Sequence, residues 1–194
     1  MAFSDIVRLV EAGASERELQ SELKRDLSIV GQAFAHPAIK DEYIAFSEFP
    51  VGHGSVDFVV FTDRSRMDVI LIEVKGANFN FLNNDGSIAA DINFAMQQIR
   101  ERLYQVQRSG YEPFRREVHL VRRSIENGCR RYNSVLGPNG YLNVDPEKDI
   151  DIWGAVIGGR TTDDLNESRV RHQMEEGTGR VRVESWDSWL RKLI

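Results

Sequence analysis

The sequence predicts an α/β (α+β) fold in which helices flank a mixed central sheet. Apolar residues recur four apart at Leu19, Leu23 and Leu27, which is the spacing of an amphipathic helix. Two runs rich in β-branched residues follow, at 55–62 and 67–74, and helical periodicity returns from about residue 88. Helix, strands, helix, and then a further strand and helix are the order expected of helices packed on a sheet.

The first predicted helix covers residues 15–26. Ser15 is a favourable N-cap residue, and Glu18 stands three residues later, as in a capping box. A strand is expected at 43–49, with Pro50, Gly52 and Gly54 marking the turn after it.

The runs 55–62 and 67–74 are separated by the polar residues 63–66 and are predicted to form a hairpin. Residues 69–72 are apolar at consecutive positions, which indicates a strand that is covered on both faces and central in its sheet. We expect Gly76 to end this strand.

The rest of the chain alternates between helix and strand signals. A helix is predicted at 88–104, with Ile92, Ala95, Met96, Ile99 and Leu103 on one side. A short strand at 118–121, a turn at 137–140, a strand at 152–157 and a closing helix at 186–193 complete the prediction.

Composition suits one soluble domain of 194 residues, with 41% hydrophobic and 28% charged residues. We expect a core at about 15–160 and a C-terminal elaboration at 161–194. A single cysteine excludes an intramolecular disulfide. The N-terminus has no signal-peptide pattern and the apolar runs are too short to cross a membrane, so we expect a cytoplasmic protein with no membrane partner. The net charge of −5 argues against non-specific coating of DNA.

The segments GSVDFVVF and LIEVKG contain the strongest candidates for catalytic residues. Strand alternation directs Glu73 and Lys75 to the same face, and the neighbouring strand supplies Asp57. Two carboxylates at a strand end are hard oxygen ligands suited to Mg²⁺ or Mn²⁺, and a lysine beside them can position water or neutralise charge on a phosphate. The alternative is an ordinary salt bridge at the end of a buried strand.

This arrangement resembles the PD-(D/E)XK nuclease superfamily, in which an Asp lies on one strand of a hairpin and D/E-x-K on the next; here Val56 replaces the usual Pro before the Asp. In the order SERELQSEL, GSVDFVVF, LIEVKGANFNFLNNDG, AMQQIRERLY, VIGGR and VESWDSWLRKL, nearly the whole chain resembles the Shedu family of anti-phage nucleases. The resemblance implies a restriction-endonuclease-like core and a Mg²⁺-dependent endonuclease that cuts or nicks DNA.

The resemblance also implies two further site residues. The helix acid of the family falls on Glu16, with Glu18 as the alternative, and it would join Asp57 and Glu73 in holding the metal. The family's glutamine falls on Gln98, with Gln97 beside it. Both have plainer interpretations, a solvated helix terminus and a polar helix face respectively.

The resemblance further implies a homo-oligomer, either a dimer or a tetramer. The competing function is a catalytically silent nuclease-fold module that binds nucleic acid or a protein partner. The histidines show no metal-ligand spacing and are interpreted as structural. The tryptophans are expected in the core. Arginines gather at 100–131, either as a backbone-binding surface or as ordinary solvated charge.

Overall fold

A computed structural model describes residues 2–193, without the side chains of Ala2, Ser109 and Thr178. Six strands form one sheet in the order β4-β1-β2-β3-β5-β6. The strands are β1 (Tyr43–Val51), β2 (Gly54–Thr62), β3 (Asp68–Val74), β4 (Asn133–Leu136), β5 (Asp151–Ile157) and β6 (Val181–Glu184). The helices are α1 (Ala2–Glu11), α2 (Glu16–Arg25), α3 (Ser28–Phe34), α4 (Ala90–Glu126), α5 (Asp164–Thr178) and α6 (Trp186–Leu190).

The sheet is mixed, as the sequence predicts. β1, β2 and β3 form an antiparallel meander, whereas β5 runs parallel to β3 and β6 runs parallel to β5. β3 lies between β2 and β5, and its residues Val69 to Ile72 are fully buried, which confirms that it is a central strand. The prediction of a mixed sheet flanked by helices is therefore confirmed, and the architecture is consistent with a restriction-endonuclease-like core.

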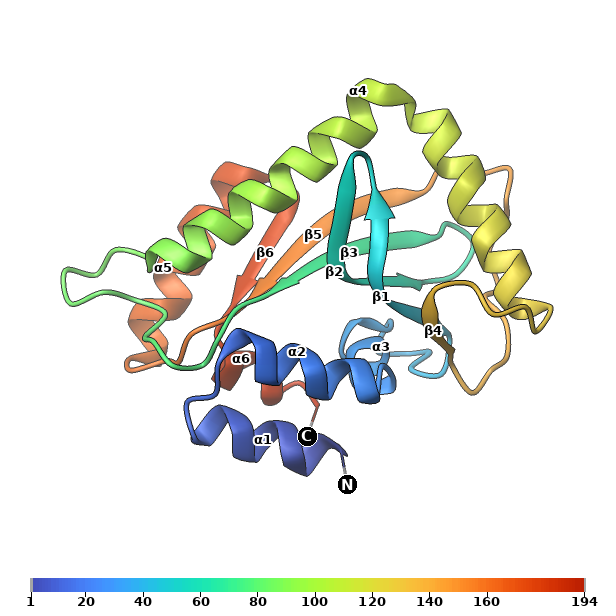
Figure 1. Cartoon of the computed structure of the whole chain (residues 1–194). Helices are drawn as coiled ribbons and strands as arrows, with labels where there is room; N and C mark the ends of the chain where they lie inside the picture. The colour runs from blue at the N-terminus through green and yellow to red at the C-terminus, as the bar shows by residue number, and fades with distance from the viewer. Residues whose placement is uncertain (1, 194) are drawn as a thin grey trace.

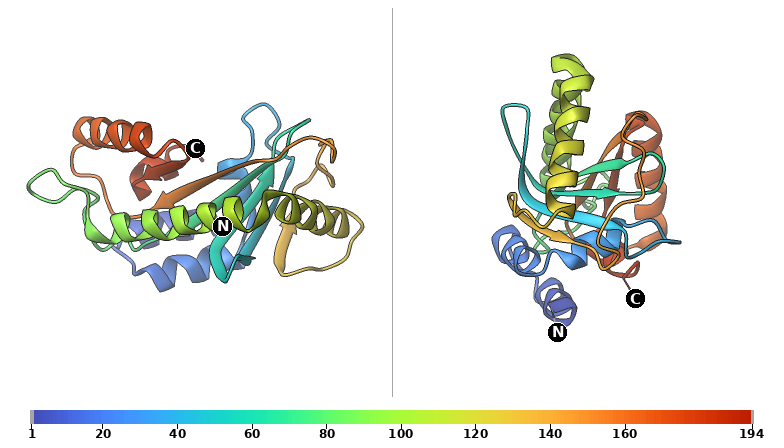
Figure 2. Two further views of the ribbon diagram at one scale, coloured as in Figure 1. Left: turned by 90° about the horizontal axis from the view of Figure 1, so that it is seen from above. Right: turned by 90° about the vertical axis from the view of Figure 1, so that its right-hand side faces the viewer.

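Helices cover both faces of the sheet. α4 and α5 pack on one face, where they contribute residues such as Ile92, Ile99 and Val170 to the core. α1, α2, α3 and α6 pack on the other face, around Leu19, Leu23 and Trp186. Figure 1 shows α4 crossing above the sheet with the N-terminal helices and α6 below it, and Figure 2 shows the same layers from above and from the side.

The prediction for 15–26 is confirmed by α2, and the hairpin prediction is confirmed by β2 and β3. The Glu18 carboxylate accepts a 2.9 Å hydrogen bond from the Ser15 backbone N–H, as the capping pattern predicts. β1 extends further than predicted and includes Pro50, which pairs with Ser55. Proline is tolerated there because β4 pairs only with 44–47, so the missing N–H has no ladder partner to lose.

The prediction of a strand at 118–121 is wrong. These residues belong to α4, which runs far beyond the predicted end at residue 104. Val118, Val121 and Ile125 recur at helical spacing and are buried against the α4 face of the core. The helix is interrupted at Gly110, whose φ of 110° and ψ of 106° are not helical, and Pro113 follows the break.

Several elements were not predicted: α1, α3, β4, α5 and β6. β6 lies in the segment expected to be a C-terminal elaboration, yet it forms an edge strand of the central sheet. The closing helix, α6, ends at Leu190, and both of its tryptophans are buried, as expected for core residues. Within residues 2–193, no helix combines the length and apolar character that crossing a bilayer requires.

Candidate active site

The site lies where β2 and β3 separate from their ladder. Phe58 pairs with Ile72 at the end of the ladder, and Asp57 and Glu73 are the next residues on the two strands. Their carboxyl groups are within hydrogen-bond contact of each other. Alternation along β3 places Glu73 on the α4 face, because Ile72 and Val74 pack on the other face. The sheet therefore brings the two predicted carboxylates side by side at the C-terminal end of its central strand.

Asp57 replaces a backbone group in the sheet ladder. Its Oδ2 accepts a 2.9 Å hydrogen bond from the backbone N–H of Val74. On the adjacent strand, the ladder of β1 and β2 skips Glu48 and Asp57, and Glu48 has a φ of 54°, a left-handed conformation that is unfavourable for a residue with a side chain. The backbone is thus distorted at the level of the carboxylates, which frees Asp57 from ordinary strand pairing.

Glu73 is buried beside Asp57, with only 6% of its surface exposed. Burial, together with the charge of Asp57 and a hydrogen bond between the two carboxyl groups, raises the pKa of Glu73 to about 8. Lys75 opposes this shift but does not cancel it. A raised pKa of this size keeps Glu73 protonated at neutral pH in the absence of a cation.

Lys75 is held by its backbone from two sides. Its N–H donates to the Ile157 carbonyl at 2.7 Å, continuing the β3–β5 pairing. Its carbonyl accepts a 2.9 Å hydrogen bond from the indole Nε1 of Trp186. A Cβ on Gly158 would lie 2.6 Å from the Lys75 Cβ, so this glycine permits the close approach of the β5 end to the lysine.

The N-terminus of α2 brings Glu16 to this position. Lys75 Nζ lies 3.2 Å from both carboxylate oxygens of Glu16, and the Gln20 side chain donates to Glu16 Oε1 at 3.2 Å. Gly76 allows α2 to come close, because a Cβ there would lie 3.2 Å from the Glu16 backbone nitrogen. Glu18 instead bonds Ser15, so the structure brings Glu16 and not Glu18 to Lys75.

The two glutamines of α4 differ in their surroundings. Gln97 is exposed and donates to Glu101 at 3.1 Å. Gln98 is half-buried, and its Oε1 is buried with no hydrogen-bond partner in the part of the chain that the structure describes. A buried amide oxygen without a partner is costly unless water or a ligand satisfies it.

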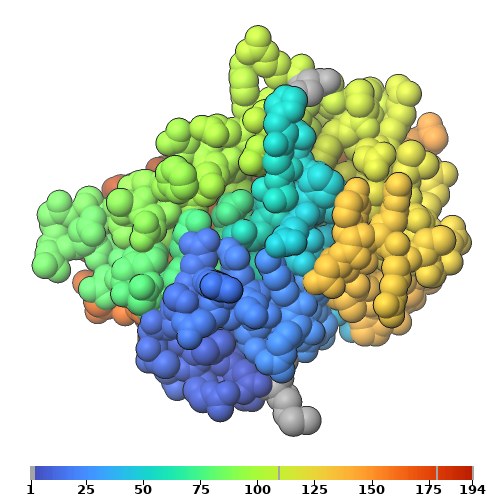
Figure 3. Space-filling view, viewed as in Figure 1, coloured from blue at the N-terminus to red at the C-terminus, as the bar shows by residue number. Residues whose placement is uncertain are grey.

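Gln98 shares a helix face with Arg102 and Gln105, at positions i, i+4 and i+7. This face meets the β1–β2 hairpin, since a Cβ on Gly54 would lie 2.4 Å from Arg102 Nη2 and a Cβ on Gly52 would lie 2.1 Å from Gln105 Oε1. Gln98 is thus turned toward the hairpin that carries Asp57. In Figure 3, the N-terminal helices, the hairpin and α4 lie next to one another on one side of the molecule.

The carboxylates do not form a complete metal cage. Among residues 2–193, no three histidine, cysteine, aspartate or glutamate side chains are grouped as metal ligands. Asp57 and Glu73 are nevertheless a pair of hard oxygen donors whose mutual repulsion a divalent cation would relieve. Mg²⁺ is commonly held by one or two carboxylates with water and substrate phosphate as its other ligands, so these two residues fit it.

A surface cavity of about 450 Å³ lies elsewhere, at the start of β3 and β5 around Asp68, Trp153 and Arg182. Its groups already satisfy one another: Trp153 Nε1 donates to Asp68 at 3.1 Å, and the Arg182 guanidinium stacks 4.4 Å above the Trp153 ring. This cavity lacks a carboxylate pair with a neighbouring lysine. The strand-end cluster is therefore the stronger candidate for catalysis.

The model of the family described as Shedu protein SduA, C-terminal, matches residues 13–190. The chain belongs to this family. Membership in the Shedu family implies a role in anti-phage defence. The matched segment runs from the turn before α2 to α6 and contains all five candidate site residues. A comparison with curated proteins finds no match.

The sequence alone missed two groups that shape the site, Trp186 and the distorted Glu48. Trp186 was correctly expected to be a core residue, but its indole N–H also fixes Lys75. Nothing local in the sequence signals this contact, because 111 residues separate the two partners. The left-handed Glu48 has no sequence signal either, since Asn and Gly are the usual residues in that conformation.

Proposed function

We propose that this Shedu-family protein is a metal-dependent endonuclease that hydrolyses or nicks DNA at Asp57, Glu73 and Lys75. One observation carries the proposal: the buried Glu73 and the half-buried Asp57 lie together at the end of the central strand, beside a lysine fixed by both of its backbone groups. A pair of carboxyl groups is costly to bury, and a bound divalent cation would offset that cost. The SduA family match supports a role in anti-phage defence, and DNA cleavage would be the activity used in that role.

In the proposed reaction, water attacks phosphorus and the bond to the leaving oxygen of the phosphodiester breaks. Asp57 and Glu73 would hold Mg²⁺ or Mn²⁺, which when bound polarises the phosphoryl oxygen and activates water. Lys75 would neutralise charge that develops on the phosphate. Glu16 contacts the lysine and would keep it oriented or help to hold the cation. The amide oxygen of Gln98, which is buried without a hydrogen-bond partner among residues 2–193, would orient the attacking water.

The test is incubation of supercoiled plasmid with the protein in Mg²⁺, Mn²⁺ or EDTA. We expect relaxed or linear product in either metal and none in EDTA, with Glu73→Ala and Lys75→Ala inactive. Glu147→Gln, which alters an exposed acid away from the site, is the matched control and should cut like the unchanged protein. Cutting that is insensitive to EDTA or to both site substitutions would contradict the proposal.

A catalytically silent module is the competing function. It would bind plasmid or a protein partner in all conditions and yield no product with any metal. Linear, nicked and supercoiled substrates, compared in the same assay, would define what an active enzyme prefers.

We also propose that the protein acts in the cytoplasm as a homo-oligomer. Exposed apolar side chains on its helices, with Phe94 and Tyr104 of α4 each more than half exposed and Leu165 of α5 79% exposed, support association. Light scattering on the purified protein would distinguish a monomer from a dimer or a tetramer.

A further inference from the structure

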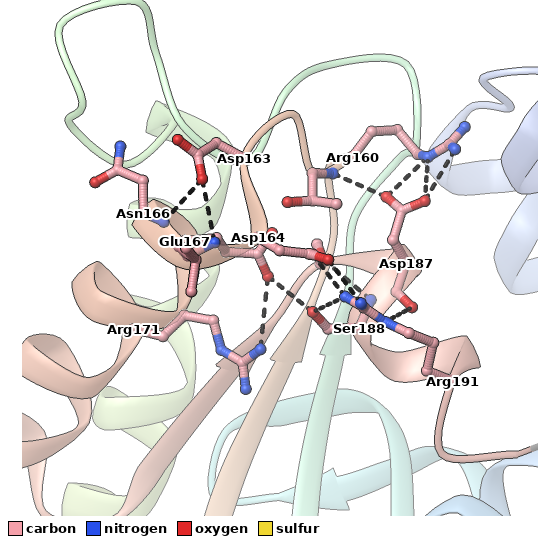
Figure 4. Close-up of polar contacts among 12 residues, drawn as sticks. Arg160, Asp163, Asp164, Asn166, Glu167, Arg171, Asp187, Ser188 and Arg191 are labelled. Carbon is pink, nitrogen blue, oxygen red and sulfur yellow. Dashed lines mark hydrogen bonds and ion pairs between the residues drawn. The ribbon is translucent and has the colours of Figure 1, made fainter.

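A network of charged side chains joins α1, the loop after β5, and α6 (Figure 4). At its centre, Arg160 Nε and Nη2 bond the Asp187 carboxylate at 2.9 to 3.1 Å. The remaining nitrogen, Nη1, donates to the backbone carbonyl of Val10 at 2.7 Å. A guanidinium has a fixed planar fork of donors, so this side chain can hold a carboxylate and a carbonyl at the same time.

Val10 lies near the C-terminal end of α1, just before the turn into α2. Gly13 and Ala14 close that turn through backbone hydrogen bonds to the end of α1. The Ala14 carbonyl then accepts a 2.8 Å hydrogen bond from the backbone N–H of Ala77. The segment that leads into Glu16 is therefore fixed at two points, one by Arg160 and the other by the chain just after Lys75.

The backbone of Arg160 contacts the segment that leaves Lys75. Its N–H donates to the Phe79 carbonyl at 2.8 Å, and its carbonyl accepts from the Phe81 N–H at 2.9 Å. The preceding residue, Gly159, donates to the Gly76 carbonyl at 2.8 Å. One residue thus holds both chain segments that carry the ion pair between Glu16 and Lys75.

We propose that Arg160 is a positioning residue, which fixes α1 and the turn into α2 so that Glu16 meets Lys75. Its effect on cleavage rests on the proposed nuclease function, whereas its effect on the geometry does not. Arg160 does not touch the carboxylate pair itself. Its side chain acts through the Val10 carbonyl, whereas its backbone holds the loop at 76–81.

A neighbouring pair provides the matched control. Arg191 makes two bonds to Asp164, at 2.7 and 2.8 Å, in the same network. Its other hydrogen bonds go to Asp187 and Ser188, so within residues 2–193 the hydrogen bonds of its side chain stay in the α5 and α6 region. Removing Arg191 therefore deletes a similar ion pair without releasing the segment before Glu16.

Hydrogen exchange of the free protein, followed by mass spectrometry, tests the geometry directly. In Arg160→Ala we expect amides at 11–20 to exchange about ten-fold faster or more, as loss of a charge-assisted hydrogen bond implies, whereas amides at 75–81, which the backbone of residue 160 still bonds, should change less. Arg191→Ala should leave these segments unchanged. Arg160→Lys keeps a positive charge for Asp187 but lacks the planar guanidinium that also reaches Val10. Its amides at 11–20 should therefore exchange as fast as those of Arg160→Ala, while its melting temperature stays near that of the unchanged protein.

Cleavage kinetics test the consequence. Because misplacement of a catalytic group lowers the rate of the chemical step, we expect Arg160→Ala to reduce kcat by about ten-fold to a hundred-fold with little change in KM. Unchanged exchange at 11–20 in Arg160→Ala, an equal increase in Arg191→Ala, or wild-type protection in Arg160→Lys would each overturn the proposal. Faster exchange with unchanged kcat would overturn the catalytic part. A protein that cuts no DNA would refute the nuclease function while the exchange result still stands.

Discussion

Replacing Glu73 with glutamine should stabilise the metal-free protein, and the gain should grow with pH. The folded-state pKa of Glu73 is raised from 4.5 to about 8, so the folded protein retains a proton that the unfolded chain releases. Stability from the protonated group is fully present below pH 4.5, declines as pH rises, and is lost above the folded pKa. Glutamine resembles the protonated acid and does not ionise.

The size of the effect follows from the shift. A change of roughly 3.5 pKa units corresponds to at most about 5 kcal/mol of unfolding free energy between the two limits. For a chain of this length, each 1 kcal/mol changes the melting temperature by roughly 2–4 °C. We therefore expect Glu73→Gln to melt up to roughly 10–20 °C above the unchanged protein at high pH and close to it at low pH.

Thermal melts in EDTA, from about pH 5 to about pH 8.5, measure this difference across most of the titration range. Glu147→Gln removes an exposed charge and should follow the unchanged protein throughout. Millimolar Mg²⁺ should raise the melting temperature of the unchanged protein, more at high pH because the proton must leave, and should not affect Glu73→Gln. A difference between Glu73→Gln and the unchanged protein that is constant with pH would refute the assignment of this buried acid.

Three further substitutions test the surroundings of the site. Gly158→Ala should destabilise the protein by about 1–3 kcal/mol and lower the cleavage rate, because the added Cβ would lie 2.6 Å from the Cβ of Lys75. Gly177→Ala is the control: a Cβ there meets open space, so this substitution should be neutral or stabilising. Glu48→Gly should be more stable than Glu48→Ala by about 1 kcal/mol, because both lose the ion pair with Lys24 but only glycine relieves the left-handed strain; equal melting temperatures would contradict this. Burial and the charge of Arg122 lower the pKa of His119 to about 4, so the stability it contributes is present above about pH 6.5 and lost as pH falls toward 4. The melting temperature of His119→Leu should therefore fall less than that of the unchanged protein between about pH 6.5 and 4. An equal fall in both proteins would contradict this prediction.

The strongest local patterns in the sequence were sufficient to locate the chemistry. The hairpin of β2 and β3 follows from two β-branched runs and one polar turn, and alternation alone places Glu73 and Lys75 on one face. The pairing of β3 with β5 could not be predicted in the same way, because it joins residues about 80 positions apart in the sequence and has no local signature.

The errors have the same origin. A window of four residues at 118–121 fits a strand, whereas the longer window that includes Ile125 shows helical spacing. β6 is only four residues long and becomes recognisable as a strand through its parallel partner, β5. The resemblance selected Gln98 as the site glutamine, but the polarity of the two neighbours could not show that Gln98 is half-buried and Gln97 exposed.

The bond from Trp186 to the Lys75 carbonyl has a consequence for synthesis on the ribosome. The strands that carry Asp57, Glu73 and Lys75 are made before the groups that fix the lysine and α1, since Trp186 and its neighbour Asp187 follow Lys75 by more than 100 residues. We expect a nascent chain that lacks them to have an incompletely ordered site. If the protein cuts DNA as proposed, its site would therefore be completed only after α6 has been made.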